Sequence, residues 1–347
     1  MAAFVFATCL PGLEPALKLE VARTRPELRF AYSRPGLVTF KSARAVAPDD
    51  PPGSVFAHVW GRSIGAASDP ASAAVQLAAL GAARVHVFAR EPEAATDLAP
   101  WRAIDQLGPL GQLGSLGPLG SLGQLGPGGP AELGELVADV IVAPAAGEPA
   151  WLGVHRHDRL RLPHAGGAIP VDVPADAPSR AYAKIEEAIA WARLPIEAGH
   201  VALEIGAAPG GAVLALARRG VEVWGVDTGE LAQGVRALPN VHHIAKKVGA
   251  LRFEDLPPRI DWLLVDVNLA PQVALHEVGR LMPRLMPGKP RLAPALRGAV
   301  FTLKLNDWSF VSELPALIDR IRQIGLPDVR ARHLPSNRRE VCVVALQ

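Results

Sequence analysis

The sequence predicts an α/β domain with a mostly parallel, Rossmann-like sheet, preceded by an α+β region. Residues 201–227 read as strand, glycine-rich turn, helix and strand, which is the opening unit of such a sheet. From Ser179 onward, apolar strand patterns alternate with helical ones, as is typical of parallel strands. Before residue 163 the pattern includes a hairpin around residues 33–36, which indicates antiparallel pairing.

Composition bounds the class of protein. The chain has 347 residues, which is typical of about two domains. Its 49% apolar and 20% charged residues are those of a globular protein with a sizeable core, and a net charge of +2 does not demand nucleic acid. The two cysteines, Cys9 and Cys342, exclude a disulfide framework and a cysteine-based zinc site. With no signal-peptide pattern and no membrane-length apolar run, we expect a cytoplasmic protein without a membrane partner.

The first 162 residues are expected to form the α+β region. His155 and His157 lie at strand spacing and could ligate a metal, but no third ligand is evident nearby. We therefore expect no metal site and interpret both side chains as facing solvent or phosphate. Strands are predicted at 3–7, 28–32, 37–41, 54–61, 84–89, 136–143 and 151–161, and helices at 12–25 and 71–80.

Two segments of biased composition interrupt these patterns. Residues 106–129 repeat leucine and glycine at fixed offsets. A short solenoid is one interpretation, but copies this short bury little and contain many prolines, so we expect a surface loop instead. Residues 163–178 are rich in Pro, Gly and Ala and are predicted to link the first region to the domain at 179–347.

The second domain is expected to hold a parallel sheet with an antiparallel hairpin at one edge. Ser179 is the expected N-cap of the helix at 179–192. Asn306 or Asp307 is expected to cap a long helix that ends near residue 324. Strands are predicted at 201–205, 221–226, 262–267 and 299–305, a further helix at 273–285, and the closing hairpin at 329–334 and 340–346.

The glycine-rich turn at 206–211 indicates a nucleotide site. Glycines let a ligand approach the backbone closely, and a helix N-terminus presents unpaired N–H groups. Asp227 ends the next strand, where a carboxylate can accept both hydroxyls of a ribose. No Lys-Ser/Thr pair follows the glycines, so this is not a P-loop, and Pro209 removes a donor that a pyrophosphate would use. A nucleoside with an amine or carboxylate end, such as S-adenosylmethionine, fits better than a dinucleotide, and an ordinary βαβ turn is the alternative.

Charged residues stand near the expected ligand edge of this sheet. Asp266 and Lys304 fall near the carboxyl ends of predicted strands, where ligands bind in open α/β sheets. Lys184 lies on the helix before the first strand, and Glu340 opens the last strand. Each alone could be a strand-end charge that reaches solvent. Together, in otherwise apolar segments, they predict a functional site.

Five segments resemble the FtsJ-like ribose 2′-O-methyltransferases in order and spacing: SRAYAKIEEA, EIGAAPGG, LLVDV, FTLKL and NRREVCVVAL. Within that family the chain is most similar to the bacterial RlmM-type group, which acts on a cytidine of 23S ribosomal RNA. The resemblance covers residues 174–347 well and implies a class I methyltransferase domain. Over the first 150 residues it rests on FVFATCLPGLEPALKLEVA, and it implies a THUMP-like, RNA-binding region.

The resemblance implies roles for individual residues. The family's Lys-Asp-Lys-Glu tetrad falls on Lys184, Asp266, Lys304 and Glu340. Lys304 would stabilise the ribose 2′-alkoxide as it forms, Asp266 would hold Lys304 and the donor, and the other two would orient the hydroxyl and the lysine. No metal is required. The residues expected to bind the cofactor, S-adenosylmethionine, are Glu204, Gly206, Ala207, Ala208, Pro209, Gly210, Gly211, Asp227 and Asp266.

The sequence departs from the family pattern in three places. Glu204 replaces an aspartate, residues 245–249 (AKKVG) lack the acid expected near the adenine, and residues 306–308 (NDW) replace a Pro-Met motif. Two alternatives to an enzyme acting on ribosomal RNA therefore stay open: a catalytically silent RNA-binding or assembly protein, and a methyltransferase retargeted to a small molecule or peptide. Six basic side chains could form an RNA surface or simply face solvent: Arg156, Arg159, Arg161, Lys289, Arg291 and Arg297.

Overall fold

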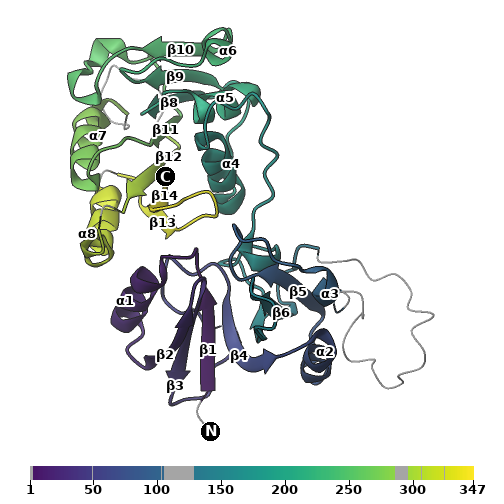
Figure 1. Ribbon diagram of the computed structural model, residues 1–347. Coiled ribbons are helices and arrows are strands. Elements are labelled where there is room, and N and C mark those ends of the chain that lie inside the picture. The colour runs from purple at the N-terminus through teal and green to yellow at the C-terminus, as the bar shows by residue number, and fades with distance from the viewer. Residues whose placement is uncertain are drawn as a thin grey trace. The chain divides into compact units, whose positions relative to one another are not determined.

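The structure, a computed structural model, forms two compact units, Met1–Ala168 and Ile169–Gln347, which are described one at a time. Figure 1 shows the elements of both. The predicted repeat segment lies outside the described residues except for Gly129, and so do Lys289, Arg291 and Asn306. The described residues are 3–48, 50–102, 104, 129–285, 296–305, 307–323 and 325–347.

The first unit is built on a seven-stranded sheet in the order β2-β3-β1-β4-β7-β6-β5. Neighbouring strands pair antiparallel, except that β5 and β6 are parallel. The predicted α+β pattern with antiparallel pairing is therefore confirmed. The elements are β1 (Ala3–Thr8), α1 (Glu14–Thr24), β2 (Leu28–Arg34), β3 (Leu37–Ser42), β4 (Trp60–Ala67), α2 (Pro70–Ala78), β5 (Arg84–Ala89), α3 (Ala99–Arg102), β6 (Leu136–Val142), β7 (Ala150–Arg156) and the 3-10 helix η3 (Ala165–Gly167).

Apolar side chains cover both faces of this sheet. On one face, Leu77 of α2 and Trp101 of α3 pack on strand residues such as Leu152. On the other face, a smaller cluster surrounds Phe6 and includes Ile141. Each large aliphatic or aromatic side chain buried in this way contributes about 1.5–3 kcal/mol.

Two predicted strands of this unit are placed wrongly. The strand expected at 54–61 begins only at Trp60 and runs on to Ala67. It begins late because the Val55 N–H donates to the Glu20 carboxylate and the Phe56 N–H donates to the Ser54 hydroxyl, which turns the chain before it. The strand expected at 151–161 stops at Arg156. It stops there because the Asp158 carboxylate accepts hydrogen bonds from the Leu160 and Arg161 N–H groups and turns the chain.

The histidines interpreted as solvent- or phosphate-facing are buried, so that interpretation was wrong. His155 is 2% exposed and His157 is 6% exposed, and His155 Nδ1 lies 2.6 Å from Asp139 Oδ2 inside the unit. Arg161 is buried too, with its guanidinium 4.3 Å from the centre of the Trp60 ring. Within the described part of the chain, no group of three or more His, Cys, Asp or Glu side chains could hold a metal ion.

The second unit carries the predicted Rossmann-like sheet. Its strand order is β10-β9-β8-β11-β12-β14-β13, and the first five strands are parallel while β14 runs antiparallel to β12 and β13. The mostly parallel sheet with a closing hairpin at one edge is thereby confirmed. The elements are α4 (Ala181–Ala192), β8 (Val201–Ile205), α5 (Gly211–Arg218), β9 (Glu222–Val226), α6 (Gln233–Arg236), β10 (Val241–Ile244), η4 (Val248–Ala250), η5 (Phe253–Asp255), β11 (Trp262–Val265), α7 (Pro271–Leu285), β12 (Gly298–Lys304), α8 (Ser309–Gln323), β13 (Asp328–Arg332) and β14 (Glu340–Leu346).

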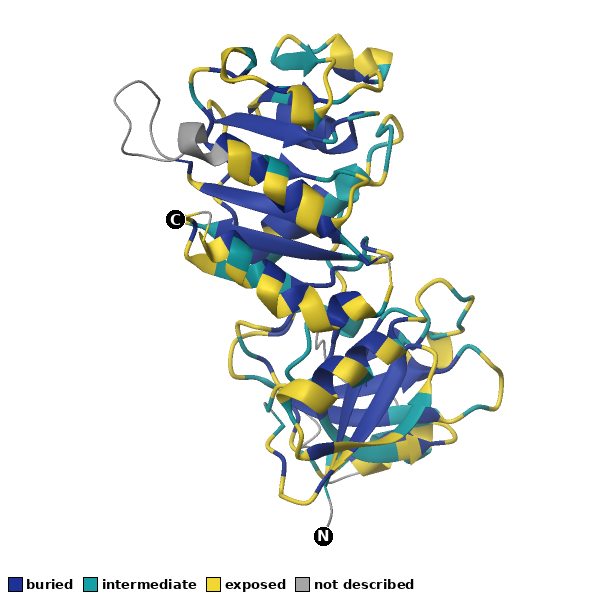
Figure 2. Ribbon diagram, turned by 90° about the vertical axis from the view of Figure 1, so that its left-hand side faces the viewer, coloured by how far each residue is buried: buried dark blue, intermediate teal, exposed yellow. Residues whose placement is uncertain are grey.

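Helices cover both faces of this sheet, with α4 and α5 on one side and α7 and α8 on the other (Figure 1). Figure 2 shows the central strands in the buried colour and the outer helices buried along one side only. The α4 and α5 side is packed by residues such as Ile185, Leu216 and Leu264. This packing fixes α4 against the sheet, which matters because α4 carries Lys184.

Element ends in the second unit differ from prediction in small ways. The strand expected at 262–267 ends at Val265, and β10 lies in a segment where the sequence analysis places no strand. The N-cap position of α4 is Arg180 rather than Ser179, although the Ser179 hydroxyl accepts a 3.3 Å bond from the Ala181 N–H. At α8 the Asp307 carboxylate accepts a 2.7 Å bond from the Ser309 N–H, as a capping residue should.

No helix among the described residues combines the length and the apolar character needed to cross a bilayer.

The contact between Gly153 and Phe6 is a test of the first unit's packing. A Cβ on Gly153 would lie 2.1 Å from Phe6 Cε1, and Phe6 is fully buried. We expect Gly153→Ala to lower the free energy of unfolding by about 1–3 kcal/mol through overpacking. Urea titrations followed by tryptophan fluorescence would measure it.

Gly279→Ala is the matched control for that substitution. Gly279 is exposed on α7, and a Cβ there would meet no atom within 4 Å. In a helix interior the added methyl is expected to stabilise by about 0.5–1 kcal/mol. Equal unfolding midpoints for Gly153→Ala and the wild type would contradict the packing of Phe6 on β7.

Candidate active site

The glycine-rich turn after β8 is pressed against the end of β11. Gly206 has a φ of 92°, and a Cβ on it would lie 2.2 Å from the Asp266 carbonyl oxygen. A Cβ on Gly211, the first residue of α5, would lie 2.3 Å from the Ser179 hydroxyl oxygen. Glycine is required at both positions because the backbone approaches its neighbours so closely.

Asp227 holds the turn from the end of β9. Its Oδ2 accepts a 3.0 Å hydrogen bond from the Ala208 N–H, and its Oδ1 accepts a 2.8 Å bond from the Gly229 N–H. The carboxylate therefore has a fixed position beside the glycine turn and retains lone pairs on both oxygens. This is the arrangement that the sequence predicts for binding ribose hydroxyls.

Glu204 is a buried acidic residue near the end of β8. It is 1% exposed, and its Oε2 has no hydrogen-bond partner among the described residues. Burial raises the pKa of Glu204 well above its usual range, and the charges of Asp266 and Asp227 raise it further. A cationic group placed beside Glu204 would satisfy the unpaired oxygen and stabilise its charged form.

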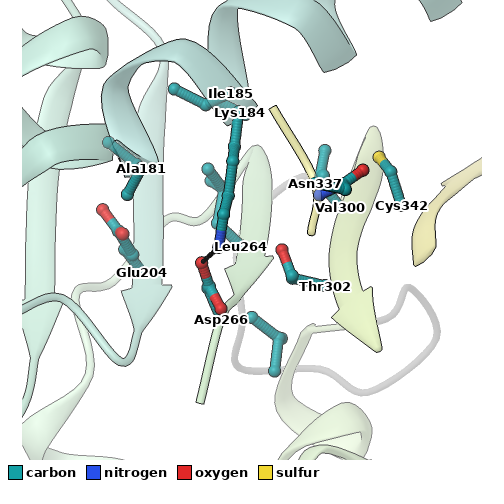
Figure 3. A pocket seen from close by; sticks show the side chains of 12 residues that line it. Ala181, Lys184, Ile185, Glu204, Leu264, Asp266, Val300, Thr302, Asn337 and Cys342 are labelled. Atoms are coloured by element: carbon teal, nitrogen blue, oxygen red, sulfur yellow. Dashed lines mark hydrogen bonds and ion pairs between the residues drawn. The ribbon is translucent and has the colours of Figure 1, made fainter. Parts of the chain in front are cut away.

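The four predicted tetrad residues meet at one point at the carboxyl end of the sheet. Lys304 Nζ lies 2.7 Å from Asp266 Oδ1 and 2.7 Å from Glu340 Oε1. Lys184 Nζ lies 3.1 Å from Asp266 Oδ2 and 2.6 Å from Glu340 Oε2. Each lysine therefore pairs with both carboxylates. Figure 3 shows Lys184 reaching from its helix toward Asp266.

The tetrad is partly buried, and each charged group favours the charged form of its neighbours. Burial alone would lower the pKa of Lys304, but the Asp266 and Glu340 carboxylates raise it above its ordinary value. Burial alone would raise the pKa of Glu340, but hydrogen bonds from Lys184 and Lys304 lower it. Lys304 is therefore an ammonium and Glu340 a carboxylate at neutral pH, so Lys304 can stabilise a developing negative charge.

A small cavity lies beside two tetrad residues, Lys184 and Asp266, and the buried Glu204. Sequence reasoning missed three polar residues that line it beside Lys184, Glu204 and Asp266: Thr302, Asn337 and Cys342. Thr302 could have been found, since it lies two residues before Lys304 on the same face of β12. Asn337 had no such signal because it lies in a loop. Burial raises the pKa of the Cys342 thiol, which keeps it neutral.

Residues 245–249, which lack the acid expected near the adenine, have an acidic side chain nearby in space. Lys246 Nζ lies 2.5 Å from Asp255 Oδ1, and the same carboxylate accepts a 2.9 Å bond from the Arg252 N–H. Lys246, which lies in this segment, is therefore paired with an acid from the short helix η5.

Of the six basic candidates, three lie in the first unit and one in the described part of the second unit. Arg156 and Arg159 are exposed in the first unit, and Arg161 is buried there. Arg297 belongs to the second unit, where its guanidinium lies 3.5 Å from Asp261. The remaining two lie outside the described residues.

The sheet order, the glycine turn after the first parallel strand and the acid at the end of the second define the fold class: a Rossmann-like domain with the mostly parallel sheet expected of a class I methyltransferase. Proteins named as methyltransferases are similar to this chain in sequence. Ribosomal RNA large subunit methyltransferase M of Alkalilimnicola ehrlichii is 34% identical over 214 residues, which are 59% of this chain and 52% of that protein. The protein of the same name from Halorhodospira halophila is 34% identical over 180 residues, 50% of this chain and 48% of its own.

The sequence is thus a relative of ribosomal RNA large subunit methyltransferase M, which confirms the resemblance read from its motifs. The chain spans about half the length of the curated relatives it matches. No protein-family model matches the chain.

Solved structures are more distant. TrmN from Thermus thermophilus has 15% identity and a TM-score of 0.34, with 99% of this chain and 100% of that chain covered. A Burkholderia thailandensis 1,6-didemethyltoxoflavin-N1-methyltransferase, solved with S-adenosylhomocysteine, has 16% identity and a TM-score of 0.33 over 51% of this chain and 93% of its own. Similarities of this size are too low to bear on function.

Glu204 gives a stability prediction that depends on pH. The folded state raises the pKa of this acid, so the folded wild type is penalised increasingly as pH rises from the ordinary range of glutamate, about 4.3, toward the raised value. Glu204→Gln does not titrate and avoids that penalty. We expect its melting temperature to exceed that of the wild type by a margin that grows between about pH 4 and pH 8, by roughly 2–4 °C for each kcal/mol relieved.

Differential scanning calorimetry across this pH range would measure the margin. Glu254→Gln is the matched control, because Glu254 is exposed and pairs only loosely, at 3.8 Å, with Arg252. A margin for Glu204→Gln that stays constant with pH would contradict the buried, destabilised carboxylate.

Proposed function

We propose that this protein is an S-adenosylmethionine-dependent ribose 2′-O-methyltransferase that acts on RNA, with ribosomal RNA as the favoured substrate. One observation carries the proposal: the Lys304 ammonium lies between two carboxylates, at 2.7 Å from each, beside a nucleotide-type turn. A ribose hydroxyl is a weak nucleophile that needs a nearby positive charge, and an ammonium held in this way supplies one.

The residues present fit the methyl donor. Asp227 is positioned for the ribose hydroxyls, and Gly206 lets the nucleoside approach the backbone. The unpaired, buried oxygen of Glu204 suits the donor's amino group. When bound, the donor supplies a methyl group on a positively charged sulfur.

The chain's own residues supply orientation and electrostatics. As the hydroxyl loses its proton to water, Lys304 stabilises the negative charge that develops on the 2′-oxygen. That oxygen would then form its bond to the donor's methyl carbon while the carbon–sulfur bond breaks. Asp266 and Glu340 hold that ammonium in place, and Lys184 fixes both carboxylates from α4. Alignment of the hydroxyl with the methyl group supplies much of the rate.

RNA is the substrate that the relatives' names favour, since they are ribosomal RNA methyltransferases. We infer that the first unit is a THUMP-like RNA-binding region, with the linker and catalytic domain bounded near residues 163–178 and 179–347. Two other candidates compete. The altered segment at Lys246 favours a silent RNA-binding protein, and the aromatic content of 5% favours a small-molecule or peptide substrate.

The mechanism predicts the effect of two substitutions. Lys304→Ala and Asp266→Asn are expected to reduce methyl transfer by at least about 10²-fold, because each removes a group that stabilises or positions charge in the transition state. Transfer of a radioactive methyl group from the donor to unmodified 23S ribosomal RNA, transcribed in vitro from the source genome, would be measured.

The control is Asp319→Asn, since Asp319 is an exposed acid on α8 that pairs with Arg322 of its own helix. Circular dichroism would establish that all three variants fold. Retained activity in both tetrad variants would sink the assigned mechanism. Activity only on small molecules or peptides would favour retargeting.

Donor binding is the second test. Calorimetric titration with S-adenosylmethionine is expected to give micromolar affinity, and Asp227→Ala is expected to weaken it at least about tenfold, because the variant loses the ribose partner and the anchor of the Ala208 N–H. S-adenosylhomocysteine should bind in the same way. No binding at millimolar donor would leave the silent RNA-binding protein as the better reading.

A further inference from the structure

The buried carboxylate of Glu187, which is outside the tetrad, connects α4, which carries Lys184, to the loop that leads to Glu340. Glu187 on α4 is 3% exposed. Its Oε2 accepts a 2.8 Å hydrogen bond from the Ser336 N–H, and its Oε1 accepts a 2.8 Å bond from the Ser336 hydroxyl. Both oxygens of this carboxylate therefore accept hydrogen bonds from one residue that lies 149 positions away in the sequence.

Each end of this contact lies close to a tetrad residue. Glu187 follows Lys184 by one helical turn, so both side chains lie on the side of α4 that faces the sheet. Ser336 precedes Glu340 by four residues in the loop that leads into β14. The contact thus joins α4, which holds Lys184, to the segment that holds Glu340.

The loop at 333–339 transmits the contact because it is held internally. The Leu334 N–H donates to Asn337 Oδ1 at 3.0 Å, and the Asn337 N–H donates to the Leu334 carbonyl oxygen at 2.9 Å. At the far end, the Leu305 N–H donates to the Arg339 carbonyl oxygen at 2.8 Å, which ties the loop to the residue after Lys304. The loop is therefore bonded to itself near one end and to the residue after β12 at the other.

We propose that the Glu187–Ser336 contact is a positioning device that holds the Glu340 carboxylate against Lys184 and Lys304. Neither Glu187 nor Ser336 touches the reacting groups in this proposal; both act through the loop and α4. This inference rests on the proposed function, since it assigns a role to residues of the same site.

Stability alone is a poor reason for this contact. Burial raises the pKa of Glu187, and the two bonds from Ser336 only partly counter that shift. An apolar pair of similar size in a buried position is often as stable as a charged group or more so. A carboxylate that accepts two directed bonds does give what an apolar pair lacks, namely a fixed position for the loop.

Glu187→Gln and Ser336→Ala are the test variants. The amide offers one acceptor oxygen to two donors, and the alanine removes the hydroxyl, so each loosens the contact without removing the backbone bond site. We expect kcat for methyl transfer to unmodified 23S ribosomal RNA transcribed in vitro to fall about 10- to 100-fold, since a displacement near 1 Å has that effect on aligned groups. KM for the donor should stay within about twofold, because its expected partners lie on other segments.

The chain provides a matched control on the same helix. Glu186, the adjacent residue, pairs instead with Arg219 of the second unit. Glu186→Gln is expected to leave kcat unchanged. Ser336→Thr keeps both donors and should restore most of the activity lost in Ser336→Ala. The double variant Glu187→Gln/Ser336→Ala should be no slower than the slower single variant, because both remove the same contact.

A second readout separates this inference from the proposed function. Acetylation of Lys184 by a water-soluble succinimidyl ester, followed by peptide mass spectrometry, reports how firmly Glu340 holds that lysine. It should be at least about threefold faster in Glu187→Gln than in the wild type and Glu186→Gln. If the wild type transfers no methyl group, the proposed function fails, and the acetylation rates alone still decide the positioning role. Unchanged acetylation, or an unchanged kcat in an active protein, overturns it.

Discussion

The mutual neutralisation of two ammonium groups and two carboxylates is the interaction on which the second unit depends. Any one of these charges, left alone in its partly buried position, would cost several kcal/mol. With each lysine within 3.1 Å of both carboxylates, the four form a closed set with no net charge. The set exists only if a helix and three strands deliver their side chains to the same place, so it constrains the arrangement of all four.

The topology of the sheet meets that constraint. β12 lies between β11 and β14, and the pairing register sets Lys304 directly opposite Glu340. Asp266 directly follows β11, at the same edge. Because β14 runs antiparallel, its first residue rather than its last reaches this edge, which explains why the glutamate opens its strand.

Much of this site could be predicted from the sequence because it lies in segments with strong periodic patterns. Asp266 and Lys304 stand in short apolar runs, where a charge is conspicuous. Glu187 and Asn337 could not be found in this way, since their partners are set by tertiary contacts with a loop. The burial of His155 and Arg161 was missed for a related reason: polar residues on a strand look solvated until a buried partner such as Asp139 is known. The strand at 54–61 was misplaced because the turn at Val55 depends on the Glu20 carboxylate, which lies 35 positions away in the sequence.

The close approach of Gly206 to Asp266 makes the donor turn and the tetrad one mechanical body. The Gly206 backbone leaves no room for a Cβ beside the Asp266 carbonyl, and the Asp266 N–H donates to the Ile205 carbonyl oxygen at 2.9 Å. A ligand that shifts this turn must also shift the aspartate that holds both lysines. Under the proposed function, donor occupancy of this turn and order of the tetrad on the acceptor side would be linked, and thermodynamic reciprocity would require the linkage to act equally in both directions.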